Sequence, residues 1–141
     1  MENTLENIEH EIALLSRLTT ALNPKKTRLD RSGYLLLSKL SLRSPQAINA
    51  IADDLKLDVS TASRQIASLE DKGFVVRFPD ENNRRISLIE ITQKGKTVYQ
   101  DVKNARSKAY SQILKEWPGE DLDLLEKMLK KLNQSLIHWD R

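Results

Sequence analysis

Cysteine is absent from this chain of 141 residues, and glycine and proline are scarce, at four residues each. Without thiols, the chain can form no disulfide, no thiolate metal site and no thiol-based redox switch. Because glycine and proline interrupt helices, their scarcity favours long helices joined by short loops. We therefore expect a mainly α-helical protein.

Long hydrophobic runs and a large excess of one charge are also missing. No apolar run approaches the roughly 20 residues of a membrane helix, and the first ten residues lack a basic and then apolar signal region. We expect a cytoplasmic protein with no membrane partner. The 23 basic and 20 acidic residues leave a net charge of only +3. This excess neither identifies nor excludes a polyanionic partner, so the positions of the charges must decide.

The sequence has no feature of a catalytic centre. It contains no Gly-rich phosphate loop, no nucleophile elbow and no prominent carboxylate pair. His10 and His138 lie at opposite ends of the chain without ligand-spaced partners, which favours solvated or interface histidines over metal ligands. We predict no enzymatic activity, no catalytic residue, no metal site and no cofactor.

Apolar stripes at helical spacing mark both ends of the chain. The first helix is predicted over residues 4–22, ending at Asn23–Pro24, with the stripe Leu5, Ile8, Ile12, Leu15, Leu18 and Leu22. The last is predicted over 119–138, with the stripe Leu122, Leu125, Met128, Leu129, Leu132 and Leu136. A small domain cannot cover both stripes, so we expect them to pair in a homodimer.

Three shorter helices are predicted between these ends by their capping residues. They are 31–42 after the N-cap Asp30, 45–54 opened by Ser44–Pro45, and 59–72 after the N-cap Asp58, ending at Lys72–Gly73. Two strands follow, 74–78 and 86–91, and a polar turn joins them. In the second strand we expect an apolar face of Ile86, Leu88 and Ile91. Thr92 then caps a helix that runs to about Trp117.

This order of elements is that of a helix-turn-helix with a β-hairpin wing, a unit that binds duplex DNA. Helix 59–72 would read the major groove, because short hydroxyls permit close approach while Arg and Gln can bond to guanine and adenine. The predicted groove contacts are Ser60, Thr61, Ser63, Arg64 and Gln65. An isolated helix of this kind would be interpreted as an ordinary capped helix with a solvated polar face. The hairpin that follows it favours DNA binding.

The wing supplies the remaining predicted contacts. Arg84 and Arg85 lie on the turn between the strands, where an arginine can reach a narrow minor groove. Lys72 and Arg77 are predicted to contact phosphate, as weaker candidates. An arginine pair on a loop is more often a solvated surface, so the wing prediction depends on its place after the reading helix.

At these residues the chain resembles the MarR (multiple antibiotic resistance regulator) family of bacterial transcription regulators. The resemblance covers nearly the whole chain. It is most specific at Leu69-Glu70-Asp71-Lys72-Gly73, at the wing Asp80 to Arg85, and at Ile91-Thr92-Gln93-Lys94-Gly95. It implies a homodimer with interleaved terminal helices, recognition helices in successive major grooves, and repression relieved by a small ligand, often an anionic aromatic one. In the family an aspartate before the two arginines helps to fix the wing arginine. Here Asn83 stands at that place, and Asp80 is a candidate substitute.

These observations predict a single domain over 1–141. Residues 29–95 form the winged DNA-binding unit, while 1–28 and 96–141 form the helical dimerisation region. The predicted function is a homodimeric repressor of a pseudo-palindromic operator. An effector pocket is expected between the dimer helices and the winged unit, lined by parts of Tyr34, Leu37 and the first helix. The alternatives are an activator and a winged-helix protein–protein interaction module that binds no DNA.

Overall fold

The computed structural model describes residues 1–22 and 29–139. Its elements are α1 Glu2–Ala21, α2 Arg31–Leu42, β1 Gln46–Ala47, α3 Ile48–Asp54, α4 Val59–Asp71, β2 Val75–Pro79, β3 Ser87–Ile91, α5 Gln93–Ile113 and α6 Gly119–His138. The predicted fold class, mainly helical with a small β wing, is confirmed. The predicted stop of the first helix at Asn23–Pro24 lies outside the described residues.

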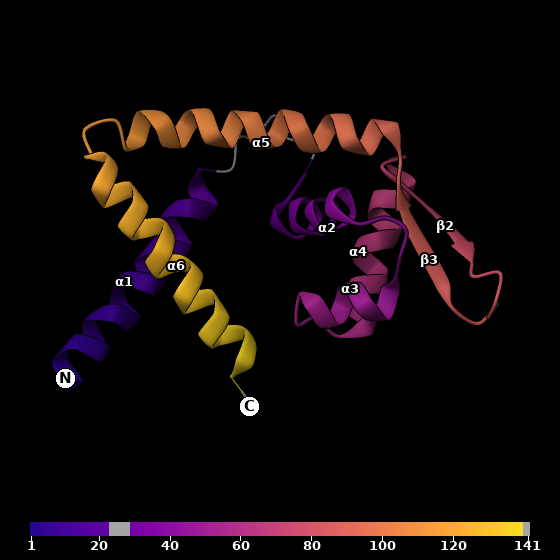
Figure 1. The fold of residues 1–141 in the computed structure, drawn as a ribbon, viewed down its shortest axis with the longest axis horizontal. Coiled ribbons are helices and arrows are strands. Elements are labelled where there is room, and N and C mark those ends of the chain that lie inside the picture. The colour runs from indigo at the N-terminus through magenta and orange to yellow at the C-terminus, as the bar shows by residue number, and fades with distance from the viewer. Residues whose placement is uncertain (23–28, 140–141) are drawn as a thin grey trace.

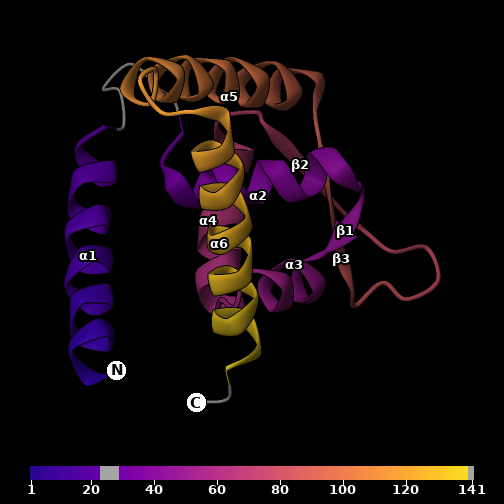
Figure 2. The same cartoon turned by 60° about the vertical axis from the view of Figure 1, so that its left-hand side comes forward.

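Helix α5 lies along the upper edge of the molecule (Figure 1). The unit from α2 to β3 lies beneath the N-terminal part of α5, and α6 turns back from its C-terminal end (Figure 1). Helix α1 stands apart from the other helices in the rotated view (Figure 2). The two ends of the chain are therefore separated from the winged unit.

Local capping explains where two of the helices begin. The carboxylate of Asp30 accepts a hydrogen bond from the Gly33 backbone N–H at 2.7 Å, and the Thr92 hydroxyl accepts one from Gly95 N–H at 3.0 Å. Each bond satisfies one of the N–H groups that the first turn of a helix leaves unpaired. At Asp58 the prediction was wrong in one respect. The residue is the N-cap of α4, but its side chain accepts no hydrogen bond there.

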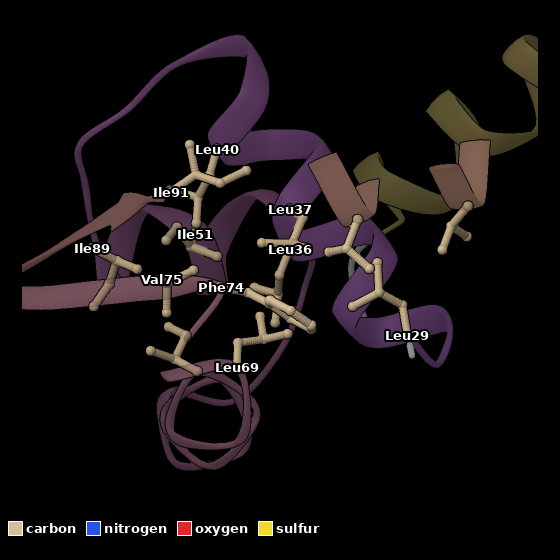
Figure 3. Packing of buried hydrophobic residues seen from close by; sticks show 13 residues of the cluster. Leu29, Leu36, Leu37, Leu40, Ile51, Leu69, Phe74, Val75, Ile89 and Ile91 are labelled. Carbon is tan, nitrogen blue, oxygen red and sulfur yellow. The ribbon is translucent and has the colours of Figure 1, made fainter. Parts of the chain in front are cut away.

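The core of the winged unit joins α2, α3, α4, the sheet and the start of α5. Its buried residues are Leu29, Leu36, Leu37, Leu40, Ile51, Ile66, Leu69, Phe74, Val75, Ile89, Ile91, Val98 and Val102. Figure 3 shows Phe74 between the leucines of α2 and Leu69 of α4. Burial of each such side chain stabilises the fold by about 1.5–3 kcal/mol before entropy is counted. This core fixes α4 against the sheet and α2.

The third predicted helix begins later than expected. Gln46 and Ala47 form the short strand β1, which pairs with Ile89 and Leu88 of β3, so α3 starts only at Ile48. The Ser44 hydroxyl accepts a hydrogen bond from the Ile91 backbone N–H at 3.1 Å, which continues this pairing. The wing is consequently a three-stranded antiparallel sheet in the order β1-β3-β2, and the predicted two-stranded hairpin forms only part of it.

The buried face of β3 also differs from the prediction. Ile89 and Ile91 are buried, whereas Leu88 is half-buried and Ile86 is exposed. Pairing explains the difference, because Ile91 lies opposite the buried Val75 of β2 and side chains alternate along a strand. Ile86 precedes the strand and belongs to the wing turn, so it follows no strand alternation.

Helix α5 ends earlier than predicted, at Ile113 rather than near Trp117. The Leu114 N–H donates to the Tyr110 carbonyl at 2.9 Å, and Trp117 N–H donates to the Leu114 carbonyl at 3.0 Å. The first bond closes the end of α5, and the second forms a separate turn that leads to the start of α6 at Gly119. Each helix end beyond the winged unit is thus defined by local backbone bonds.

Candidate nucleic-acid interface

Helix α4 presents one face to the core and the opposite face to solvent. Ala62, Ile66 and Leu69 are buried. At 3.6 residues per turn, the side chains farthest from this buried stripe are those of Ser60, Arg64, Ala67 and Asp71. All four are exposed. The outer face thus offers a hydroxyl and a guanidinium near the N-terminal end of the helix.

The five predicted groove residues divide into two groups by their exposure. Ser60 and Arg64 are exposed, whereas Thr61, Ser63 and Gln65 are half-buried. The Arg64 Nη2 donates to the Thr61 hydroxyl at 3.4 Å, a long bond at the limit of hydrogen-bond geometry. Arg64 is therefore the predicted residue best placed to reach a base edge from this face.

A groove of about 270 Å³ lies between the first turn of α2 and one side of α4. Its lining residues are Leu29, Asp30, Gly33, Thr61, Arg64, Gln65, Ser68, Leu69 and Lys72. The Gln65 Oε1 is buried and accepts no hydrogen bond within the described part of the chain. An unpaired buried acceptor costs about 1–3 kcal/mol. The Gln65 Oε1 is therefore an acceptor without a protein donor among the described residues.

Two further basic residues flank α4. Lys72 is the C-cap residue of the helix, is exposed, and lines the groove. The Arg77 Nε, from β2, lies 3.7 Å from the Glu70 Oε1 of α4. This partly exposed ion pair is worth at most about 1 kcal/mol, so it leaves Arg77 able to exchange Glu70 for another anion.

The wing turn is held by its own backbone and two short side chains. Asp80 N–H donates to the Ile86 carbonyl and Ile86 N–H to the Asn83 carbonyl, each at 2.9 Å. The Asp80 Oδ1 accepts from Asn82 N–H at 2.8 Å, and the Asn83 Oδ1 accepts from Arg85 N–H at 3.2 Å. The turn extends away from the rest of the molecule (Figure 2).

Both wing arginines are exposed at this turn. Within residues 1–22 and 29–139, no ion pair involves Arg84 or Arg85, and the Asp80 carboxylate bonds to backbone rather than to either of them. Asp80 therefore does not act as the substitute tether that was considered from the sequence. The two guanidinium groups remain available to an external anion.

Ser68 was not among the predicted contacts, although it is exposed and lines the groove beside Arg64 and Lys72. The spacing of four residues from Arg64 to Ser68 and from Ser68 to Lys72 was a visible signal, because such residues share a helix face. The predicted contacts came only from the N-terminal turns of the helix, and Ser68 lies beyond them.

The region where an effector pocket was expected contains an aromatic and cationic cluster. The rings of Tyr34 and Tyr99 lie 5.2 Å apart, and the Arg106 guanidinium lies 4.4 Å from the Tyr34 ring centroid. The Tyr99 hydroxyl donates to Ser38 Oγ at 3.3 Å. Burial raises the pKa of the Tyr34 hydroxyl, and neighbouring Tyr99 raises it further. Leu37 is fully buried in the core, so its predicted place in a pocket lining was wrong.

Other chemistries find little support among the described residues. No group of three His, Cys, Asp or Glu side chains there could hold a metal ion. The His138 Nδ1 lies 2.8 Å from the Gln134 carbonyl one turn earlier in α6. None of the described helices combines the length and the apolar character needed to cross a membrane.

Comparison with known proteins decides the family. The sequence profile of the MarR family matches residues 29–87. The chain is 36% identical over 139 residues to the uncharacterized HTH-type transcriptional regulator YxaD of Bacillus subtilis. The aligned region covers 96% of this chain and 97% of that protein. The chain belongs to the MarR family. It is therefore an HTH-type transcription regulator, not an enzyme.

Solved MarR-like structures share its fold. The transcriptional regulator SlyA is 28% identical, with a TM-score of 0.79 over 92% of this chain and 94% of that chain. The PcaV regulator of Streptomyces coelicolor, solved with its natural ligand, is 15% identical, with a TM-score of 0.79 over 91% and 92% of the two chains. In a MarR-family regulator, α4 and the wing described above form the candidate DNA interface.

Proposed function

We propose that the chain is a homodimeric repressor that binds a pseudo-palindromic operator and releases it when a small ligand binds. The observation that carries the DNA contact is the combination of an exposed polar face on α4 with a wing bearing two arginines that form no ion pair within the described residues. In this proposal α4 enters the major groove and the wing lies over the neighbouring backbone or minor groove.

The proposed contacts on α4 follow from exposure and chemistry. Arg64 bonds to guanine O6 and N7, and the exposed Ser60 contacts the groove wall or phosphate. Thr61, Ser63 and Gln65 are half-buried and contact DNA from the flanks of the helix. Gln65 exchanges its buried, unpaired state for bonds to adenine.

The proposed phosphate and minor-groove contacts lie around α4. Lys72 and Arg77 contact phosphate, and Arg77 gives up its weak pairing with Glu70 to do so. At the wing, Arg84 and Arg85 approach the minor groove, where a narrow groove attracts arginine.

Dimerisation is supported by the terminal helices. Neither α1 nor α6 has a single buried residue in the isolated chain. Both carry large exposed apolar side chains: Leu5, Ile8, Ile12, Leu14, Leu15 and Leu18 on α1, and Leu122, Leu124, Met128, Leu129, Leu136 and Ile137 on α6. Contiguous apolar surface of this kind marks an interaction site, and an isologous dimer would bury it on both copies.

Such a dimer would set the form of the operator. A two-fold axis places the two α4 helices about one DNA turn apart, roughly 34 Å, and requires half-sites of opposite orientation. Ligand relief is supported by PcaV, which shares this fold and was solved with its natural ligand.

The decisive experiment selects bound sequences from random duplexes and then titrates salt against the selected duplex. We expect an inverted repeat and an affinity that falls steeply with salt, because phosphate neutralisation releases counterions. Absence of duplex binding at low salt would favour the protein–protein module. Transcription in vitro from a promoter that overlaps the site separates repressor from activator. Repetition with a panel of small aromatic carboxylates tests ligand relief.

A further inference from the structure

The amide of Asn83 has a free donor at the tip of the wing. Its Oδ1 accepts the Arg85 backbone N–H at 3.2 Å, and its backbone carbonyl accepts the Ile86 N–H at 2.9 Å. Its Nδ2, which carries two hydrogens, donates to no group within the described residues. The acceptor side of the amide is therefore committed to the turn, and the donor side is not.

The net charge of the wing tip depends on the side chain at position 83. Over residues 80–85 the acidic Asp80 and Glu81 balance the basic Arg84 and Arg85, so the tip is neutral. A carboxylate at position 83 would also accept the Arg85 N–H, but it would make the tip net negative. A neutral amide thus keeps the turn intact without adding repulsion toward a polyanion.

We propose that Asn83 both shapes the wing turn and donates an amide hydrogen bond to a DNA backbone phosphate beside the wing arginines. The inference rests on the proposed DNA contact of the wing. It adds Asn83 as a contact residue and a phosphate oxygen as the atom that Asn83 binds. Asparagine is a normal donor to phosphate oxygens, and such bonds fix the register of a protein on the duplex. Asn83 is a positioning contact, because it carries no base information of its own.

The test compares Asn83→Asp and Asn83→Ala with the wild-type dimer on the selected operator. Asn83→Asp keeps an acceptor for the Arg85 N–H, removes the donor and adds a negative charge. We expect it to weaken binding about tenfold. Asn83→Ala removes donor and acceptor without adding charge, and we expect a loss of about threefold to fivefold. The melting temperature of each variant reports whether the turn change affects folding.

Asn82→Asp is the matched control. Asn82 is exposed in the same turn, and its hydrogen bond in the turn is made by its backbone N–H, not its side chain. The Asn82→Asp substitution introduces the same charge one residue away. We expect it to reduce operator affinity clearly less than Asn83→Asp does. Equal losses would reveal a general charge effect and overturn the proposal.

Three other results also decide the question. Binding by Asn83→Asp that equals or exceeds wild type would show that a carboxylate there steadies a wing arginine, which contradicts a donor role. Unchanged binding by Asn83→Ala would likewise overturn it. Single neutral methylphosphonates placed along the operator should locate one phosphate at which wild type and Asn83→Ala bind with equal affinity. Failure to find such a phosphate would contradict the proposal.

A failure of the underlying DNA model would look different. Arg84→Ala and Arg85→Ala test whether the wing contacts DNA at all. If neither changes affinity, the wing part of the proposed function fails. If they weaken binding while the Asn83 variants behave as wild type, only the role of Asn83 fails.

Discussion

At the scale of single residues, Arg64 is the residue on which the proposed base recognition depends most. It is exposed and lies opposite the buried stripe of α4, and among the described residues it makes only a long bond to Thr61. We expect Arg64→Ala to weaken binding to the selected operator by about 1–3 kcal/mol and to relax base preference at one position. Competition with random duplex measures both effects.

Lys72→Ala provides the comparison for Arg64→Ala. A phosphate contact carries no sequence information, so its loss should reduce affinity for the operator and for random DNA alike and lower the salt slope by about one. An equal loss on both duplexes for Arg64→Ala would assign Arg64 to phosphate as well.

Gly95 is the residue where packing leaves no room for a side chain. A Cβ there would overlap the Phe74 carbonyl oxygen and approach Ile91 Cγ1 at 2.9 Å. We expect Gly95→Ala to lower the free energy of unfolding by about 3 kcal/mol or more, because backbone rather than a flexible side chain must move. Urea denaturation measures this change. Gly119→Ala is the control, since nothing lies within 4 Å of its Cβ position; a comparable loss there would refute the steric explanation.

At the scale of elements, the two aspartates that precede α2 and α4 behave differently. Asp30 accepts a hydrogen bond from Gly33 N–H, whereas the side chain of Asp58 makes no such bond. We expect Asp30→Ala to destabilise the protein by about 1 kcal/mol and Asp58→Ala by less than about 0.5 kcal/mol. Thermal or urea unfolding of both variants gives the comparison. The reverse order would show that capping does not set the stability of these helices.

The elements also show which features of the fold can be predicted from sequence. Helix α2 and the start of α5 were predictable, because Asp30 and Thr92 act on backbone within three residues. Strand β1 was not, because Gln46–Ala47 become a strand only by pairing with β3, more than 40 residues away. The face of β3 was mispredicted for the same reason. Its partner strand decides which side chains are buried, and a run as apolar as Ile86 to Ile91 allows either choice.

The candidate site likewise has some features that the sequence predicts and others that depend on packing between helices. Helical periodicity is sufficient to place Ala62, Ile66 and Leu69 on one face of α4 and Ser60 and Arg64 on the opposite, exposed face. It could not predict that Gln65 would line a groove against α2 and bury its Oε1, since that groove exists only when two helices pack. The roles of all these residues toward DNA remain predictions.

At the scale of the whole molecule, the exposed apolar faces of α1 and α6 form the proposed dimer interface. We expect Leu15→Asp to convert the dimer to a monomer, because a charge would be buried in the proposed interface. Loss of the second half-site contact should then weaken operator binding by about 100-fold. Analytical ultracentrifugation and DNA titration measure the two consequences.

Leu42→Asp is the control for this prediction. Leu42 is 84% exposed at the end of α2, away from both terminal helices. The same substitution there should leave the dimer intact. A Leu15→Asp protein that remains dimeric at micromolar concentration would exclude the α1 face from the interface.

The length of α5 has a consequence for how the molecule can be switched. One unbroken helix of 21 residues connects the winged unit to the C-terminal helix α6. At 1.5 Å per residue it acts as a lever arm about 31 Å long, so a tilt of about 5° at one end moves the other by about 3 Å. That shift is comparable to the rise of one base pair. In the proposed dimer, a small tilt of α5 at the dimer end would therefore be enough to move α4 out of register with its half-site.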